Sequence, residues 1–267
     1  MSFTIASWNI NSLLPRLSVV ARLLREEHPE VLCLQKCKAA KGDVPLSVFE
    51  DLGYPHSAIR DQGQVNGVAI FSRMPIVETA EADIAGQGEA RYLFARLANG
   101  IGIHNMYVPA GGSIPDASND PGFGKKKAFL ADARDRFRAD RPTNAILVGD
   151  LNIAPDQDDV YDHALLKNQV THSPDESDML AAVREAGDWV DVLRKVQPTG
   201  AMYSWWSYRW WNAKVPVGHK NDKGRRIDHI WASPDLVVRL QSAWVDRTAR
   251  DWKGTSDHAP VFASFDI

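Results

Sequence analysis

Polar residues that could carry out phosphate chemistry stand at the ends of four apolar, strand-like runs. They form four close pairs: Asn9 and Asn11 in SWNIN, Asp150 and Asn152 in VGDLN, Asp228 and His229 in RIDHI, and Asp257 and His258 in SDHAP. Any one such pair is more often a turn, a cap or a surface group than part of a site. Because α/β proteins tend to place their chemistry at strand ends, four pairs together predict one shared site.

These residue types suit the hydrolysis of a phosphodiester. That reaction needs a positioned water, neutralisation of charge on the phosphate and a proton for the leaving oxygen. Carboxylates can hold a divalent metal ion or orient the water, and asparagine can donate hydrogen bonds to the phosphate. A histidine paired with an aspartate can supply positive charge or the proton.

The composition sets broad limits on the protein class. The 267 residues suit one large α/β domain or two smaller ones, and 44% hydrophobic residues allow a sizeable core. With no internal repeat or low-complexity linker, we expect a single domain over residues 1–267. The formal net charge of -3 neither predicts nor excludes a nucleic-acid partner, because binding needs a local basic face. The start of the chain has no signal-peptide pattern and no run approaches a membrane span, so we expect a soluble cytoplasmic protein without membrane contact.

Periodicity predicts many strands and few helices. Nine runs alternate or are continuously apolar, as strands do, at residues 3–10, 31–35, 67–72, 92–98, 101–108, 144–152, 227–233, 236–245 and 260–267. Three segments have helical spacing, at 15–29, 125–140 and 173–187. This pattern favours two sheets packed together with helices outside. Long irregular stretches at 108–125 and 208–226 predict functional loops, and the second mixes tryptophans with cations.

Eight motifs occur in the order expected of one known family. They are WNIN, LCLQ, NGVAIFSR, YVPAGG, VGDLNIAP, YSWWSYR, RIDHI and SDHAPV. From Ile5 to Phe265 the chain resembles the exonuclease III family of abasic-site endonucleases, within the endonuclease/exonuclease/phosphatase (DNase I-like) superfamily. The resemblance implies an α/β four-layer sandwich, in which two packed β-sheets are flanked by helices. It also implies a metal-dependent phosphodiesterase that uses Mg²⁺ or Mn²⁺.

The resemblance assigns catalytic roles residue by residue. Asp150 matches the aspartate that activates water or protonates the leaving group, and Asn152 matches its phosphate-binding partner. Tyr107 matches a tyrosine that contacts the scissile phosphate. His258 matches the imidazole that is paired with the aspartate at Asp228.

Metal and substrate contacts are also implied. Asn9 and Asp257 match residues at the metal ion, together with Asp150 and Asn152, and Asn11 matches a polar residue near the phosphate. The pocket for an abasic sugar is implied at Trp205, Arg225 and Ile227, and a DNA contact at Asn212. Arg225 departs from the family, which usually has an apolar or aromatic residue there, so substrate choice is expected to differ.

Lys36 is the largest departure from the family pattern. The strand normally ends in Leu-Gln-Glu-Thr-Lys, and here it reads LQKCK, so Lys36 stands at the position of the principal metal-binding glutamate. A protonated ammonium cannot ligate a metal ion and repels one. We expect the ammonium to lie among Asp150, Asp228 and Asp257 and to weaken metal binding. The alternative is that it points to solvent while the carboxylates hold a metal ion loosely.

Three functions follow as hypotheses. The first is a monomeric nuclease of base-excision repair that acts on duplex DNA, cutting 5′ to abasic sites and trimming 3′ ends or lesions. The second is a catalytically impaired relative that binds duplex DNA and recognises lesions. A phosphatase or lipase of the superfamily is the third, but the chain shows no loops that specify such substrates.

Overall fold

The computed structural model describes residues 2–267, and its strands form two six-stranded β-sheets. The first sheet has the order β11-β12-β1-β2-β4-β3, with strands Leu240–Val245, Val261–Asp266, Ser2–Asn9, Val31–Gln35, Val68–Ser72 and His56–Arg60. The second has the order β5-β6-β7-β8-β10-β9, with strands Ile76–Glu81, Tyr92–Leu97, Gly102–Tyr107, Ala145–Asp150, Asp228–Ala232 and Val190–Asp191. The α-helices are α1 (Leu17–Glu27), α2 (Leu46–Asp51), α3 (Pro121–Ala139), α4 (His163–Leu166), α5 (Pro174–Ala186), α6 (Val192–Val196) and α7 (Pro234–Val237).

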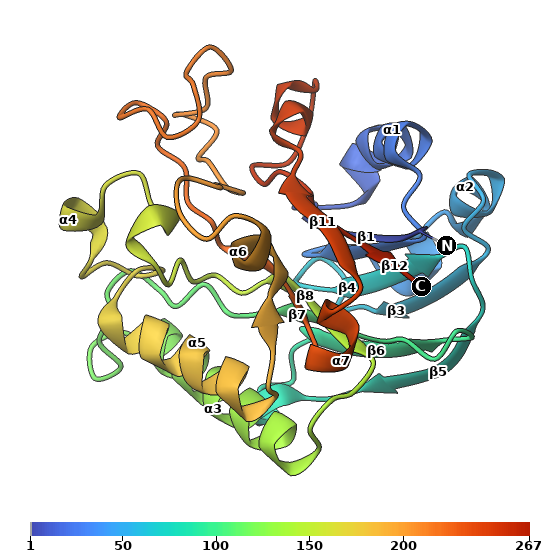
Figure 1. The fold of residues 1–267 in the computed structure, drawn as a ribbon, viewed down its shortest axis with the longest axis horizontal. Helices are drawn as coiled ribbons and strands as arrows, with labels where there is room; N and C mark the ends of the chain where they lie inside the picture. The colour runs from blue at the N-terminus through green and yellow to red at the C-terminus, as the bar shows by residue number, and fades with distance from the viewer. Residues whose placement is uncertain (1) are drawn as a thin grey trace.

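The two sheets pack face to face with helices outside both. Helices α1 and α2 lie on one side of the sheets, and α3 and α5 lie on the other (Figure 1). One apolar cluster joins α1 to the outer face of the first sheet, through Leu23 and Trp8 among others. Another joins α3 and α5 to the outer face of the second sheet, through Phe129 and Leu180. The predicted four-layer arrangement of the DNase I-like type is confirmed.

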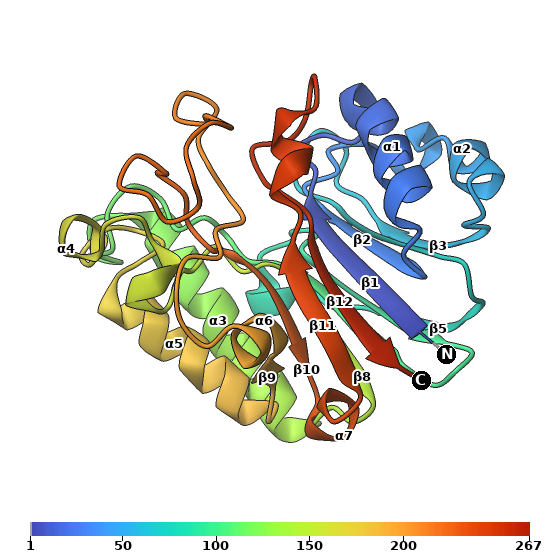
Figure 2. The same cartoon turned by 45° about the horizontal axis from the view of Figure 1, so that its top comes forward.

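Side-chain alternation explains how one strand serves two layers. On β1, Ile5 packs between the sheets, and its neighbour Ala6 faces the outer cluster with α1. Strands buried on both faces read as continuous apolar runs, which is why β1, β2, β4 and β8 are visible in the sequence. The described chain ends lie together, since Ser2 pairs with Asp266 at the shared end of the neighbouring strands β1 and β12 (Figure 2).

Most of the predicted elements are confirmed to within two residues at either end, but two predictions are wrong. The predicted strand 236–245 is divided: residues 236–237 end α7, which starts after Ser233, and β11 begins only at Leu240. Helix α3 begins at Pro121 and not at Lys125, because the Asp120 side chain caps it by accepting a hydrogen bond from Gly122 N at 2.8 Å.

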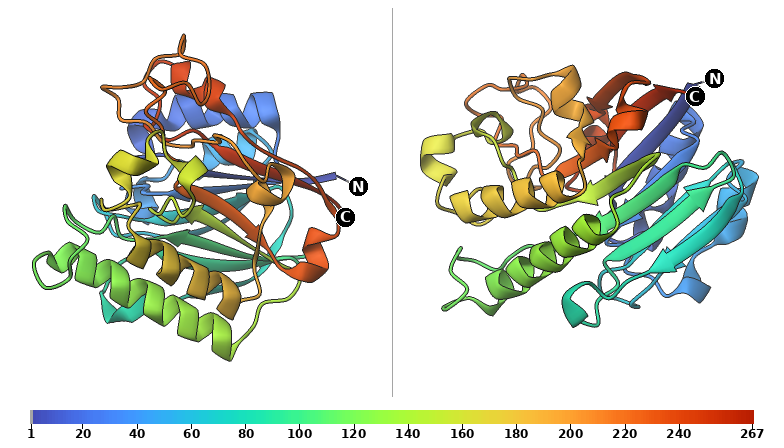
Figure 3. Two further views of the ribbon diagram at one scale, coloured as in Figure 1. Left: turned by 60° about the vertical axis from the view of Figure 1, so that its left-hand side comes forward. Right: turned by 60° about the horizontal axis from the view of Figure 1, so that its bottom comes forward.

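Several short elements escape the sequence pattern. Strand β5 carries Val77, Glu78 and Thr79 on exposed positions of a sheet edge, so it has no apolar periodicity. Strands β3 and β9 and helices α2, α4 and α6 are also absent from the prediction. Helices α3 and α5 run side by side across the second sheet (Figure 3). Within residues 2–267, no helix is both long and apolar enough to span a membrane.

Candidate active site

Strand topology brings the polar residues together at one edge of the sandwich, where strands of both sheets begin or end. Strands β1 and β2 are parallel, as are β7 and β8, so Asn9, Tyr107 and Asp150 all end their strands at this edge. Strand β10 runs antiparallel to β8, so it starts at the same edge with Asp228 opposite Asp150. Strand β12 is antiparallel to β1, so the residues before it, including His258, arrive there too.

A cavity of about 160 Å³ lies at this edge. The predicted site residues that line it are Asn9, Lys36, Tyr107, Asp150, Asn152, Trp205, Arg225, Ile227, Asp257 and His258. Two further residues line it: Ala110, which stands in the YVPAGG motif, and Thr171, whose loop carries no sequence signal. The structure therefore assembles most of the predicted residues around one hollow.

Asp150 is held by hydrogen bonds from two asparagines. Asn9 Nδ2 donates to Asp150 Oδ2 at 2.7 Å, and the backbone N–H of Asn152 donates to Asp150 Oδ1 at 3.0 Å. Asn152 Nδ2 donates to Val108 O at 2.8 Å and to Asp150 Oδ2 at 3.2 Å. Burial raises the pKa of Asp150 to about 6, an effect opposed by His258 and by these hydrogen bonds.

The backbone before Asp150 requires glycine. Gly149 has a φ of +145°, and a Cβ at this position would lie 1.8 Å from Met106 O on the neighbouring strand. A side chain there would force β7 and β8 apart, and these strands end in Tyr107 and Asp150. The glycine of the GDLN motif thus sets the spacing of the two predicted catalytic residues.

His258 lies between two carboxylates. Its Nδ1 is 2.9 Å from Asp228 Oδ2, and its Nε2 is 3.8 Å from Asp150 Oδ2. Ser204 Oγ donates to Asp228 Oδ2 at 2.6 Å. Burial lowers the pKa of His258, but the Asp228 and Asp150 carboxylates outweigh it and raise the pKa to about 9. The imidazole is therefore a cation at neutral pH.

Asp257 lines the same cavity and is held by two side-chain donors. Asn11 Nδ2 donates to its Oδ1 at 3.2 Å, and Trp205 Nε1 donates to its Oδ2 at 3.0 Å. Burial raises the pKa of Asp257, but His258, the Trp205 indole and Lys36 together hold it below its usual value. Asn11 reaches the site through this contact and does not itself line the cavity.

Lys36 lines the cavity and is half-buried there. It follows β2 with a φ of 56°, in the left-handed region. Burial lowers the pKa of Lys36, although the Asp257 and Asp150 carboxylates act to raise it. Within residues 2–267 no ion pair joins its ammonium to a carboxylate. The side chain thus lies at the cavity wall near both carboxylates without touching either.

Arg225 also lines the cavity. Its Nη1 donates to Val170 O at 3.2 Å and to Thr171 Oγ1, and its guanidinium carbon lies 5.8 Å from the centre of the Trp205 ring. Its buried Nε has no hydrogen-bond partner among the described residues. The structure does not bring Asn212 to this cavity: Asn212 is exposed, and its Oδ1 accepts a hydrogen bond from Lys214 N at 3.0 Å.

A buried ion pair that the sequence analysis did not predict holds the backbone of Asn152. Lys126 on α3 is fully buried, donates to Asn152 O at 2.8 Å and to Ala110 O at 3.2 Å, and pairs with the equally buried Glu176. Glu176 also accepts hydrogen bonds from Ser173 at the start of α5. The Ser173–Glu176 spacing is a capping box, which can be recognised in the sequence. Lys126 is the one buried lysine of KKK, and the sequence does not distinguish it from its two neighbours.

Replacing Lys126 by methionine should strongly destabilise the fold. It leaves the buried Glu176 carboxylate without its cation, so we expect the free energy of unfolding to fall by about 3–5 kcal/mol. Urea unfolding measures it, with Lys127→Met as the control because the Lys127 side chain is 43% exposed. Equal losses of unfolding free energy in the two variants would show that the buried pair contributes no more to stability than the exposed lysine does.

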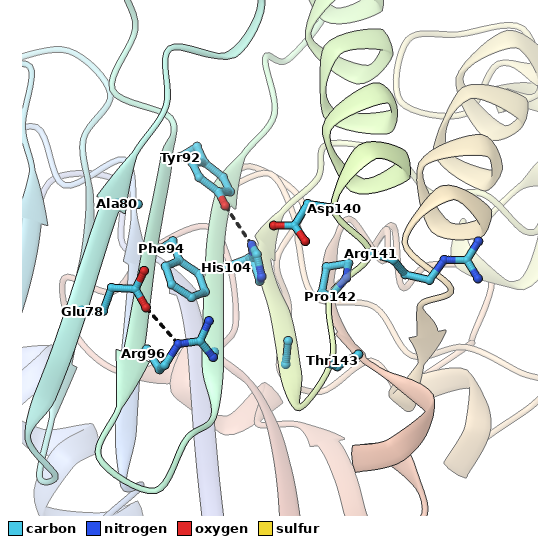
Figure 4. A pocket seen from close by; sticks show the side chains of 12 residues that line it. Glu78, Ala80, Tyr92, Phe94, Arg96, His104, Asp140, Arg141, Pro142 and Thr143 are labelled. Carbon is cyan, nitrogen blue, oxygen red and sulfur yellow. Dashed lines mark hydrogen bonds and ion pairs between the residues drawn. The ribbon is translucent and has the colours of Figure 1, made fainter.

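A larger cavity of about 330 Å³ lies away from this edge (Figure 4). It includes Gly102, at the end of β7 opposite to Tyr107. Its polar groups pair with one another: Arg96 Nε donates to Glu78 Oε2 at 2.9 Å, and the Tyr92 hydroxyl bonds to His104 Nδ1 at 2.8 Å. This internal pairing indicates a structural role, so the smaller cavity is the candidate active site.

Three side chains of the site carry atoms that could ligate a divalent metal ion. Asp150, Asp228 and His258 offer atoms within 4.8 Å of one another, and such a cluster could hold a cation. However, a protonated imidazole has no free lone pair, and His258 is held in this state between the two carboxylates. Lys36 adds an ammonium to the same cavity. The residues present therefore do not fit a tightly bound divalent ion.

Comparisons with known proteins agree with this geometry. Residues 6–258 match the Endonuclease/Exonuclease/phosphatase family. Exodeoxyribonuclease III of Haemophilus influenzae is 27% identical, across 97% of this chain and 98% of that protein. Two solved structures have a TM-score of 0.89 and cover 99% of this chain and 100% of their own. They are the 3′ phosphatase NExo from Neisseria bound to a product DNA hairpin, at 32% identity, and an AP endonuclease from Archaeoglobus fulgidus, at 31%.

The family match covers nearly the whole chain, and the relatives share its full length. The motifs, the two packed sheets and the cavity at their common edge all agree with that match. The chain is therefore a member of the Endonuclease/Exonuclease/phosphatase family, in its exodeoxyribonuclease III and AP endonuclease branch of metal-dependent phosphodiesterases.

Proposed function

We propose that the protein is a DNA-repair nuclease of base-excision repair, which hydrolyses the phosphodiester 5′ to an abasic site. The observation that carries this proposal is the Asp150–His258–Asp228 array beside two asparagines on one cavity. Its relatives include exodeoxyribonucleases and an AP endonuclease, and one was solved with DNA. The same cavity would serve 3′-5′ exonuclease or 3′-end trimming activity, and we expect the protein to act as a monomer.

The geometry gives each residue a role. Asp150 is positioned by Asn9 and Asn152 to orient a water and to accept its proton. His258, kept cationic by Asp228, would stabilise negative charge that develops on the phosphate. Tyr107 lines the same cavity, and burial raises its pKa to about 12. Its hydroxyl therefore stays protonated and would donate a hydrogen bond to a phosphate oxygen.

The pH dependence of cleavage should follow Asp150 and His258. Asp150 works as a carboxylate, so the rate should rise as pH passes about 6; His258 works as a cation, so the rate should fall as pH passes about 9. The two groups are close enough that these limits belong to the pair. Cleavage rates of an abasic duplex, measured below, between and above these two pH values, test this pH profile. A rate that still climbs above pH 9 would contradict the role of His258.

The loop at residues 208–224 is the proposed DNA contact. It carries Arg209, Lys214 and Lys220 on exposed positions, which suits the phosphate backbone. Arg226 is not part of this surface, because it is buried and paired with Asp159 and Asp191. Asn212 is on the same exposed loop, and its contact with DNA stays a prediction.

Trp210 is the tryptophan of this region that faces outward. Trp205, Trp206 and Trp211 each donate the indole N–H to an aspartate, at 3.0, 2.8 and 2.9 Å. Trp210 is 42% exposed, and the Lys223 ammonium lies 5.2 Å from its ring centre. An exposed ring beside cations is suited to stack on an unpaired base.

Replacing Trp210 by alanine should therefore weaken DNA binding without unfolding the protein. Loss of one stacked base costs about 1 kcal/mol or more, so we expect about a fivefold weaker Kd for a duplex with a single-stranded 3′ extension. Fluorescence anisotropy measures it, and Trp210→Phe should retain most of the affinity. If alanine and phenylalanine bind equally well, the ring does not stack on DNA.

Cleavage of a duplex that holds one abasic site tests the proposed function. Purified protein is assayed with Mg²⁺, with Mn²⁺ and with a chelator, and we propose that both ions bind weakly because of Lys36. Lys36 also favours a second candidate function, a DNA-binding relative with impaired catalysis. That candidate predicts salt-dependent duplex binding with negligible turnover under every metal condition. Absence of both binding and cleavage would rule out both functions.

A further inference from the structure

Two cationic side chains meet at the cavity from different sheets. Lys36 follows β2 of the first sheet, and Arg225 stands before β10 of the second. Both line the cavity that holds Asp150 and Asp257. Neither cation is ion-paired there: within residues 2–267 Lys36 has no ion pair, and the Arg225 side chain donates only to Val170 O and Thr171 Oγ1. The cavity therefore presents two cationic side chains that no carboxylate contacts.

The charges of the site already balance without a metal ion. Three lining side chains are cationic, Lys36, Arg225 and His258, and two are carboxylates, Asp150 and Asp257. Asp228, behind His258, brings the whole set to neutrality. A glutamate at position 36 would leave two excess negative charges, which is the charge that one divalent cation neutralises. Lys36 thus supplies the charge balance that a glutamate with its metal ion would otherwise give.

The free donors suit a terminal phosphate better than an internal phosphodiester. A phosphate monoester carries close to two negative charges at neutral pH and has three terminal oxygens, whereas a diester carries one charge. The Lys36 ammonium and the Arg225 guanidinium match that charge, and charge-assisted hydrogen bonds to phosphate are among the strong ones. An arginine in the place implied for an abasic sugar also favours an anion over an uncharged sugar.

We propose that this cavity binds a terminal phosphate monoester directly on Lys36 and Arg225, without a divalent cation. The inference rests on the proposed function in taking that phosphate from the 3′ end of DNA. Tyr107 and His258 line the same cavity and would donate to the remaining phosphate oxygens. The site would then hold phosphate-terminated 3′ ends whether or not a metal ion is present.

Binding in the presence of a chelator tests this directly. Labelled DNA hairpins ending in a 3′-phosphate, a 3′-hydroxyl or a 5′-phosphate are titrated with the protein by fluorescence anisotropy in EDTA. We expect the 3′-phosphate hairpin to bind at least about tenfold more tightly than the 3′-hydroxyl hairpin, the equivalent of one charge-assisted hydrogen bond. The 5′-phosphate should give no such gain, and added Mg²⁺ should not increase the preference for 3′-phosphate.

Variants assign the effect to the two cations. Lys36→Met and Arg225→Met should each remove most of the preference in EDTA, and Lys36→Glu should make it depend on Mg²⁺ or Mn²⁺. Lys41→Met is the matched control, because Lys41 is exposed and outside the cavity. Circular dichroism confirms that each variant is folded. Equal affinity for the two 3′ ends in EDTA, or a preference that both methionine variants retain, would overturn the proposal.

A titration with inorganic phosphate separates this inference from the proposed function. If the protein binds no DNA at all, the nuclease proposal fails. Calorimetric binding of inorganic phosphate in EDTA, lost in Lys36→Met but kept in Lys41→Met, would still support the anion site and would identify a free phosphate monoester as its ligand. Absence of both DNA and phosphate binding in EDTA would overturn the inference.

Discussion

Replacing Asp150 by asparagine should lower the rate of abasic-DNA cleavage by about 10²–10⁴-fold, the usual contribution of a general base. Asparagine keeps the shape and can still accept a hydrogen bond from Asn9, but it cannot accept a proton from water. The loss should appear in kcat more than in KM, because the group acts on the reacting water.

Binding measurements separate this effect from a structural one. The Asp150→Asn protein should bind an abasic duplex at least as well as the parent, since removal of a negative charge from the cavity favours an anionic ligand. Single-turnover rates and anisotropy on the same duplex supply both numbers. A variant that cleaves at the parent rate would exclude Asp150 as the base.

Replacing Lys36 by glutamate should have the opposite effect and increase metal-dependent cleavage. The change removes a repelling charge and restores a carboxylate in a cavity that already contains Asp150 and Asp257. A bound metal ion can supply several kcal/mol of charge stabilisation, so we expect a gain of at least about tenfold with Mg²⁺, equivalent to about 1.4 kcal/mol. Lys36→Ala should gain less, because it removes the repulsion without adding a ligand.

A charge-matched control makes this test specific. Lys41→Glu changes the net charge equally on the exposed surface, and exposed charges are worth only about 0–1 kcal/mol. Its cleavage rate should therefore match the parent. If Lys36→Glu leaves the rate unchanged while the parent is fully active, Lys36 has no influence on the metal ion.

The main layers of the fold were predictable because their strands are buried on both faces. The continuous apolar runs of β2 and β8 give a strong strand signal, and the capping box at Ser173 predicts where α5 begins. Strand β5 has no such signal, because its outward side chains are exposed. The start of α3 at Pro121 depends on the Asp120 cap, which lies inside a loop rich in glycine and proline.

The site was predictable where residues of a pair are close in sequence, and not where folding brings the partners together. The pairs Asp150–Asn152 and Asp257–His258 stand in short motifs, and the structure places all four at one cavity. Ser204 stands in the YSWWSYR motif, but its hydrogen bond to Asp228, 24 residues away, appears only in the fold. Asn212 lies on the loop that the irregular stretch 208–226 predicts, and it does not line the cavity.

Product mapping on a duplex with one abasic site shows whether the protein cuts 5′ to that site and whether the cut depends on Asp150. Each strand end is labelled, and the parent and Asp150→Asn proteins are compared on a denaturing gel with Mg²⁺ and with Mn²⁺. We predict a single cut 5′ to the abasic site by the parent, strongly reduced in Asp150→Asn. No cut by the parent under either metal ion, or the same cut at the same rate by both proteins, would contradict it.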